Sequence, residues 1–212
     1  MIHIVDNITS TNAWLSKYYS EIDDIVLAIE QTQGRGRRGN VWESQLGGFF
    51  GSIVSAKHEL LPLVVGISII NALEKYCEGL SLKWPNDIIL EDKKLGGILC
   101  EDFGTYSVIG IGLNLDNKPP LEDTTNLSSH GIDLDKSVFL ASFLFHFDIN
   151  SSLTPEEIIE EFTKFDCLID NEVFWDGNSG IVKSIDLDGS LVVQLEGQKI
   201  NLYSEEVHLE RH

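Results

Sequence analysis

Several features that would define a class of protein are scarce or missing in this chain. Its 212 residues include three cysteines, at positions 77, 100 and 167, and no C-x-x-C pair. We therefore expect ordinary buried thiols in a reducing compartment and not a disulfide framework. The most apolar window, at 60–70, is shorter than the roughly 18 residues of a membrane span. The N-terminus shows no basic or apolar region of a secretion signal, so we expect a cytoplasmic protein that does not contact membranes.

Positive charge is scarce as well. Lys and Arg number 15 against 34 Asp and Glu, and the formal net charge is −19. Binding to nucleic-acid phosphates requires an extended positive surface, so this balance argues against a nucleic-acid-binding protein. Hydrophobic residues make up 42% of the chain, and the length suits one moderate domain with or without a small appendage. The chain can therefore bury a core, and disorder is excluded.

The few arginines are concentrated in one stretch. Three of the four lie in EQTQGRGRRGNVW, residues 30–42. The glycines spell G-x-G-x-x-G, but a dinucleotide fingerprint requires a helix directly afterwards, and the following residues have no helical period. An RGG-type nucleic-acid tether would need repetition and a disordered surround. Two interpretations stay open: a structural turn, and a loop that binds a small anion through forked guanidinium hydrogen bonds.

Periodicity and capping residues predict an α+β domain over 1–171 and a second domain over 172–212. Helices are expected after the N-cap cluster Ser10-Thr11-Asn12, from Pro62 to Gly79, over 135–150, and over 154–169, where Thr154 and Glu157 form a capping box. Strands are expected over 24–32, around Ile53 and Val54, and as three consecutive antiparallel strands over 81–115. From 172 onward, short strands separated by DG, LDG and EG turns predict a small all-β domain.

Five motifs follow one another in a distinctive order. They are STN (10–12), QTQGRGRRGNVW (31–42), KWPND (83–87), KLGGIL (94–99) and GIGLN (110–114). Their order and spacing resemble the biotin–protein ligase family, in a stand-alone form without the winged-helix DNA-binding domain of some members. The resemblance implies an α+β fold of the class II aminoacyl-tRNA synthetase/biotin ligase type, with a mixed or antiparallel sheet, flanking helices and a small C-terminal Src-homology-3-like β-barrel. The chain departs from the family pattern at Asn40, where many members have Arg, and at Glu205, where the C-terminal signature has Gly.

The resemblance also implies a two-step reaction. Biotin and ATP, with Mg²⁺, give biotinyl-5′-adenylate and pyrophosphate, and a specific lysine of a biotin carboxyl carrier protein then accepts the biotinyl group. The implied partners are thus biotin, ATP and the carrier protein, and a homodimer is allowed. Two alternatives remain open. One is a lipoate–protein ligase, which shares fold and reaction logic, and the other is a non-catalytic module that binds biotin or its adenylate.

The motifs place the family's functional residues on this chain. Lys94 matches the catalytic lysine, and Arg35 and Asp87 are implied to act with it, Asp87 also as the Mg²⁺ ligand. The implied biotin contacts are Ser10, Thr11, Asn12, Gln31, Arg35, Gly36, Arg37, Lys94, Gly96 and Gly97. The implied ATP contacts are Arg35, Arg37, Asn40, Trp42, Asn86, Asp87, Lys94 and Asn114. These residue types suit the ligands, because a neutral ureido ring requires paired amides and hydroxyls, whereas carboxylate and phosphate require cations.

Overall fold

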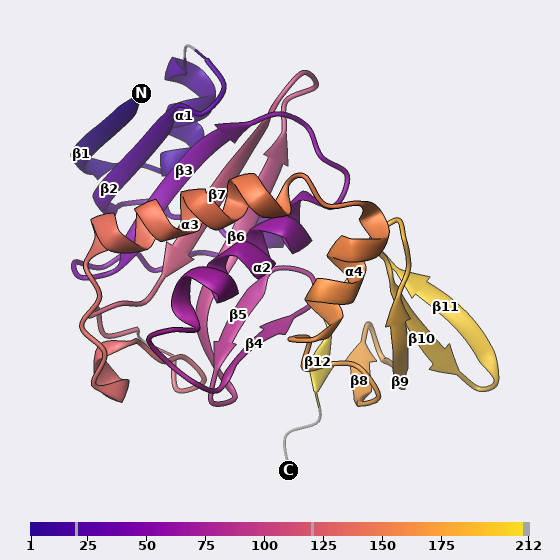
Figure 1. Ribbon diagram of the computed structural model, residues 1–212. Coiled ribbons are helices and arrows are strands. Elements are labelled where there is room, and N and C mark those ends of the chain that lie inside the picture. Colours follow the sequence, from indigo (N-terminus) through magenta and orange to yellow (C-terminus); the bar gives the residue numbers. More distant parts are fainter. Residues whose placement is uncertain (20, 120, 210–212) are drawn as a thin grey trace.

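The computed structural model describes residues 1–19, 21–119 and 121–209, which form two β-sheets and four α-helices (Figure 1). The larger sheet has seven strands in the order β1-β2-β3-β7-β6-β5-β4. Only β1 and β2 pair in parallel, and the other neighbours are antiparallel. The predicted mixed sheet is therefore confirmed. Its strands are β1 (Ile2–Ile8), β2 (Ile25–Gln31), β3 (Phe49–Ser55), β4 (Leu80–Lys83), β5 (Asp87–Leu90), β6 (Lys93–Asp102) and β7 (Ser107–Leu113).

The sequence prediction was wrong about two parts of this sheet. The segment 81–115 contains most of four strands and not three, because a turn at Trp84–Asn86 separates β4 from β5. Pro85 lies in this turn, and proline cannot donate a hydrogen bond to a strand ladder. The edge strand β1 was missed entirely. Its isoleucines at 2 and 4 are 54% and 74% exposed, so β1 lacks the buried apolar pattern by which strands are recognised.

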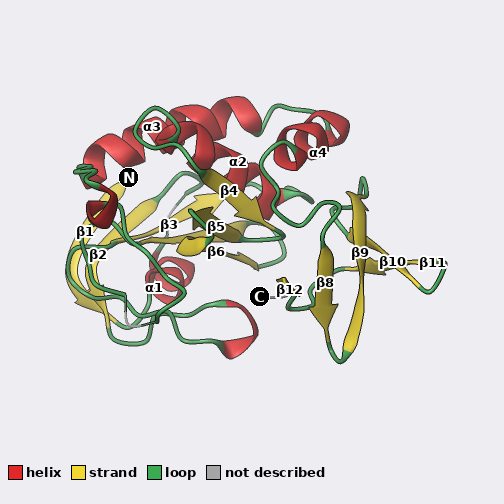
Figure 2. Ribbon diagram, turned by 90° about the horizontal axis from the view of Figure 1, so that it is seen from below, coloured by secondary structure: helices red, strands yellow, loops and turns green. Residues whose placement is uncertain are grey.

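The helices cover both faces of the large sheet. Figure 2 shows α2 (Leu61–Leu73), α3 (Lys136–Asn150) and α4 (Pro155–Thr163) on one face and α1 (Thr11–Tyr18) on the other. The predicted N-caps are confirmed at Ser10 and at Thr154, where the capping box with Glu157 is complete. Within the described residues, no helix has the length and hydrophobicity to cross a membrane.

Two of the helices end earlier than the sequence predicted. The second ends at Leu73 and not at Gly79, because the N–H of Tyr76 bonds back to the Leu73 carbonyl and tightens the chain into a turn. Gly79 instead has φ of +74° immediately before β4, a conformation that glycine adopts without strain. The fourth helix likewise ends at Thr163 and not at 169.

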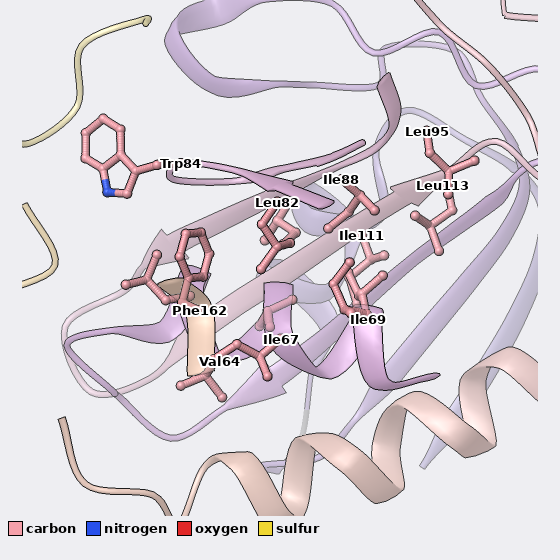
Figure 3. Packing of buried hydrophobic residues seen from close by; sticks show 14 of the residues in the cluster. Val64, Ile67, Ile69, Leu82, Trp84, Ile88, Leu95, Ile111, Leu113 and Phe162 are labelled. Carbon is pink, nitrogen blue, oxygen red and sulfur yellow. The ribbon is translucent and has the colours of Figure 1, made fainter. Parts of the chain in front are cut away.

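The main core lies between the large sheet and α2. Almost every residue of α2 is buried, because α3 covers the side of α2 that faces away from the sheet (Figure 1). Figure 3 shows Val64, Ile67 and Ile69 of α2 among side chains from the strands and from Phe162 of α4. Such a helix is apolar on all sides, so its hydrophobic pattern does not mark its end.

The C-terminal residues form a second sheet of five antiparallel strands in the order β11-β10-β9-β8-β12. The strands are β8 (Glu172–Trp175), β9 (Asn178–Ile185), β10 (Leu191–Leu195), β11 (Gln198–Leu202) and β12 (His208–Leu209). The predicted series of short strands is confirmed, and Gly177, Gly189 and Gly197 occupy its turns with positive φ. Within the described residues the edge strands β11 and β12 do not pair with each other, so the predicted Src-homology-3-like barrel is not confirmed.

Trp84 joins the two sheets. Its side chain is only 2% exposed, and its indole Nε1 donates a hydrogen bond of 2.9 Å to the carbonyl of Gly189, between β9 and β10. Its backbone N–H donates to Asp166, whose pKa is raised to about 6 by burial although three backbone hydrogen bonds lower it. One hydrophobic cluster runs through both sheets, from α2 to Trp175 and Val182. The C-terminal sheet is therefore packed against the chain segment that carries the KWPND motif.

We expect Trp84→Phe to lower the free energy of unfolding by about 1–3 kcal/mol more than Trp175→Phe, because it leaves the Gly189 carbonyl without its donor. Trp175 is also buried, at 6% exposed, and forms no hydrogen bond through its indole within the described residues, so it controls for the loss of ring area. Urea unfolding of both variants measures the difference. Equal losses would mean that the hydrogen bond does not stabilise the junction.

Candidate active site

The large sheet, the arginine-rich loop, the start of α1 and the C-terminal segment enclose a cavity of about 130 Å³. Most of the residues predicted from the motifs line it: Ser10, Thr11, Asn12, Gln31, Arg35, Gly36, Arg37, Asn40, Trp42, Asn86, Asp87, Lys94 and Gly97. The chain between residues 10 and 97 thus converges on one place.

Two predicted residues lie outside this lining. A Cβ added to Gly96 would lie 2.3 Å from Leu113 Cδ2, so Gly96 faces β7 and not the cavity. Asn114 is 3% exposed, and its amide is occupied within the fold. The Nδ2 donates to the Thr125 carbonyl at 3.0 Å, and the Oδ1 accepts from Asn117 at 2.8 Å.

The arginine-rich loop is a closed turn. The N–H of Gly36 bonds to the Asn40 carbonyl at 2.7 Å, and the N–H of Trp42 bonds to the Gly34 carbonyl at 3.0 Å. Between them, 37–39 form a short 3-10 turn in which Arg38 has a φ of +54°. No α-helix follows the glycines, which agrees with the rejection of the dinucleotide fingerprint. The turn projects Arg35 and Arg37 into the cavity lining.

Lys94 and Asp87 form an ion pair at the centre of the site. Lys94 Nζ lies 2.7 Å from Asp87 Oδ1, and both side chains are partly buried, at 33% and 20% exposed. Asp87 begins β5 and Lys94 lies near the start of the neighbouring β6, so the sheet places them together. The ammonium also lies 5.6 Å from the centre of the Trp42 ring, within cation–π range. The site therefore holds the Lys94 ammonium group, which a ligand anion can share with Asp87.

Arg35 has a partner that the sequence did not reveal. Its guanidinium lies 3.1 Å from Glu101 Oε2, and Asn12 Nδ2 donates to the same oxygen at 2.8 Å. Asn12 is itself held by Ser52, whose hydroxyl donates to Asn12 Oδ1 at 2.5 Å. Asn12 thus orders the site through Glu101.

A β-bulge explains why Glu101 was missed. Ile88 pairs with Gly96 while Ile89 pairs with Lys94, so Leu95 is an extra residue in β6. Strict alternation would put Glu101 on the opposite face from Lys94. The extra residue reverses the alternation, and Lys94, Gly97 and Leu99 consequently line the same cavity.

Neutral polar side chains gather on the side of the cavity formed by β2 and α1. Gln31 Oε1 accepts from the backbone N–H of Thr11 at 2.7 Å and from its hydroxyl at 3.0 Å. Gln31 Nε2 donates to Ser44 Oγ at 2.7 Å. Ser10 caps α1 close by, with its hydroxyl accepting from the N–H of Ala13. This group can exchange hydrogen bonds with an uncharged polar ligand without leaving amides unpaired.

The Trp42 indole lies against strand backbone where glycine leaves room for it. A Cβ at Gly112 would lie 2.5 Å from Trp42 Nε1 and Cε2, and one at Gly97 would lie 3.2 Å from Cζ3. Nε1 is buried and has no hydrogen-bond partner within the described residues. A buried unpaired donor costs free energy, which a ligand or water that accepts from this nitrogen would recover.

Arg37 connects the loop to distant parts of the chain. It donates to Asn86 Oδ1 at 3.0 Å and to the carbonyl of Ser204, between β11 and β12, at 3.1 Å. Burial lowers the pKa of Arg37, nearby Arg38 lowers it further, and Asp87, Glu206 and Glu205 oppose this shift. Ser204 and Glu206 also line the cavity. The sequence analysis assigned no ligand to these two residues, which lie far along the chain between β11 and β12.

The chain is similar in sequence and in structure to known protein ligases. The model of the biotin/lipoate A/B protein ligase family matches residues 3–115. The bifunctional ligase/repressor BirA of Salmonella typhimurium is 30% identical over 229 residues, covering 92% of this chain and 70% of that protein. The biotin protein ligase from Aquifex aeolicus, solved in complex with biotin and ATP, aligns with a TM-score of 0.88 and 28% identity over 100% of this chain and 99% of that one. The biotin protein ligase from Leishmania major, solved in complex with biotinyl-5-AMP, aligns with a TM-score of 0.69 and 27% identity. That alignment covers 95% of this chain and 98% of the other.

We expect Gly112→Ala to destabilise the protein by about 1–3 kcal/mol, because the added methyl group overlaps the base of the Trp42 ring. In a Trp42→Ala background the same change should cost much less, so a double-mutant cycle measured by urea unfolding should give a clear coupling energy. If Gly112→Ala costs the same in both backgrounds, the ring does not rest on this glycine.

Proposed function

The chain belongs to the biotin/lipoate A/B protein ligase family, and we propose that its cavity activates biotin with ATP and passes the biotinyl group to a lysine of a carrier protein. The observation that carries this proposal is the combination of two chemistries in one cavity. Neutral donors and acceptors gather around Gln31, and cations gather around Lys94. Both solved structures named above are of biotin protein ligases, which favours biotin over lipoate.

The first step joins a carboxylate to the α-phosphate of ATP. A carboxylate oxygen of biotin attacks the α-phosphorus, an O–P bond forms, and the bond to the β-phosphate breaks to release pyrophosphate. Negative charge on the phosphoryl oxygens must be stabilised by cations that are already in position. Lys94 can transfer part of its interaction from Asp87 to these oxygens, and Arg35 and Arg37 supply forked donors. We assign Lys94, Arg35 and Asp87 as the catalytic residues.

The remaining lining residues suit the two ends of the intermediate. Ser10, Thr11 and Gln31 would exchange their present hydrogen bonds for those of the ureido ring, at no net loss of pairing. Gly36 and Gly97 let the backbone approach the ligand, and Asn12 keeps Arg35 in place through Glu101. Trp42, Asn40 and Asn86 would contact the nucleotide. We propose that Gly96 and Asn114, which lie behind the lining, act by positioning β6 and β7.

Mg²⁺ fits the site only in combination with ATP. Within the described residues no group of three His, Cys, Asp or Glu side chains could share a metal ion. Mg²⁺ is commonly held by one or two carboxylates together with substrate phosphates and water. Asp87 provides such a carboxylate in the cavity. The ion would neutralise phosphate charge there, while Asp87 keeps Lys94 oriented.

In the second step the amine of the carrier lysine attacks the acyl carbon, the N–C bond forms, and AMP leaves with the electrons of the broken C–O bond. We propose that 1–171 form the catalytic unit and that 172–212, as a small Src-homology-3-like domain, help to close the site and engage the carrier. The hydrogen bond from Arg37 to Ser204 supports a role of the C-terminal domain in closing the site, because it joins the arginine-rich loop to that domain. We propose that the protein acts in the cytoplasm, where ATP is available. The net charge of −19 supports the absence of nucleic-acid binding.

Pyrophosphate release from Mg·ATP tests the proposal directly. We expect release that depends on biotin, and little release with lipoate or with neither acid. Comparable turnover with lipoate would assign the protein to the other branch of the family. Biotin binding without any release of pyrophosphate would make it a non-catalytic binding module.

We expect Lys94→Ala to reduce adenylate formation at least about 100-fold and to leave biotin affinity within about tenfold, because a contact made in the transition state is lost more than one made in the ground state. Lys93→Ala is the matched control, since Lys93 is adjacent but exposed and does not line the cavity. Single-turnover measurement of adenylate in both variants decides the point. Near-normal formation in Lys94→Ala would move the catalytic role to another residue.

A further inference from the structure

The C-terminal segment 203–207 holds a carboxylate at the cavity in a defined position. Leu202 and Val207, on either side of the bend, are each only 3% exposed and anchor it in the core. Glu205 tightens the bend, because its Oε2 accepts from the backbone N–H of Tyr203 at 2.7 Å and of Ser204 at 2.9 Å. Glu206, the next residue, is exposed and lines the cavity. Its position is therefore fixed by its neighbours and not by contacts of its own.

Glu206 differs from the other carboxylates of the site because, among the described residues, no cation lies close enough to form an ion pair with it, although Arg37 attracts it from a distance. Asp87 is paired with Lys94, and Glu101 is paired with Arg35. In the described part of the chain, the side chain of Glu206 forms neither an ion pair nor a hydrogen bond. The guanidinium of nearby Arg37 already donates to Asn86 and to the Ser204 carbonyl. The Glu206 carboxylate is thus available to pair with a cationic group of an incoming substrate.

The second step brings a cation to this site. A lysine side chain has a pKa of about 10.4 in water and arrives as an ammonium ion. The cavity lining contains four cations, namely Arg35, Arg37, Arg38 and Lys94, and they repel an incoming ammonium ion. A carboxylate at the lining offsets part of that repulsion and raises the local concentration of a cationic substrate.

We propose that Glu206 receives the ε-ammonium group of the acceptor lysine and positions it for transfer. This inference rests on the proposed function and concerns only its second step. Glu206 acts here as a positioning residue. The ammonium group loses one proton to water, the amine nitrogen bonds to the acyl carbon while the C–O bond to AMP breaks, and the nitrogen then releases a second proton to water. Two other uses of the charge, holding the arginine-rich loop or helping to hold Mg²⁺, would act on the first step instead. The two half-reactions therefore separate these roles.

The test uses the full chain with Glu206→Gln. The matched control is Glu172→Gln in β8, because Glu172 is exposed and lies outside the cavity. Adenylate is formed first and is then mixed with increasing amounts of an isolated biotin carboxyl carrier domain. We expect Glu206→Gln to raise the half-saturating carrier concentration about tenfold and to form adenylate within about twofold of the parent rate. Glu172→Gln should change neither quantity.

Three further measurements exclude a merely structural effect. The advantage of the parent protein over Glu206→Gln should shrink as salt is added, because the interaction is electrostatic. Glu206→Asp should recover part of the loss. With hydroxylamine, a nucleophile that is largely uncharged at neutral pH, the parent and Glu206→Gln should transfer biotin equally.

Unchanged use of the carrier in Glu206→Gln, or a matching loss in adenylate formation, would overturn the inference. An equal loss with hydroxylamine would overturn it as well, since no ammonium ion is then involved. Failure of the parent protein to form adenylate at all is a different result, because it removes the proposed function and not only the role of Glu206.

Discussion

Four cationic side chains line one cavity of a chain that is acidic overall, and they must be held together when no anion lies between them. Three of them have specific partners that the fold supplies. Lys94 is paired with Asp87, Arg35 with Glu101, and Arg37 with two neutral oxygens. These interactions lower the cost of bringing like charges together. They also orient each cation before a ligand arrives, and such preorganisation is what makes charged groups effective in catalysis.

The same interactions tie distant parts of both sheets to the site. Asp87 comes from β5, Glu101 from the far end of β6, and Ser204 from the connection between β11 and β12. The arginine-rich loop thus contacts the large sheet and the C-terminal sheet together. Trp84 anchors the second sheet to the KWPND turn. A shift of either sheet would therefore change the hydrogen bonds of Arg37 to Asn86 and Ser204.

The sequence predicted the parts of the structure that depend on local signals. The capping box at Thr154 and the glycine turns of the second sheet lie where their chemistry placed them. The lining residues from the five motifs also converge, apart from Gly96 and Asn114. Features that depend on long-range packing were missed. The edge strand β1 has exposed isoleucines and was not predicted. Helix α2 was predicted, but it is buried on all sides, so its apolar pattern did not show that it ends at Leu73.

Three residues near the site were not predicted for the same reason, since their positions also depend on long-range packing. Glu101 is reached only after the extra residue at Leu95 has reversed the alternation of β6, and a bulge has no reliable signature in one sequence. Ser204 and Glu206 lie in a segment whose place beside the cavity depends on how two sheets pack. At Asn12, a predicted biotin contact, the structure adds a hydrogen bond that the motif does not show. Its amide acts through Glu101 on Arg35.

Three glycines, which have no side chains, form part of the cavity lining and leave room for larger neighbours. Gly97 on β6 and Gly110 and Gly112 on β7 leave backbone where Trp42 and Asn12 rest. A pocket lined by large side chains can be remodelled in small steps, because one apolar residue can replace another of similar size. A glycine has no smaller replacement, and an added methyl group would overlap Asn12 at Gly110 or Trp42 at Gly112 and would crowd Trp42 at Gly97. Gradual change of ligand preference is therefore restricted at these glycines, and it is left to lining positions that carry larger side chains.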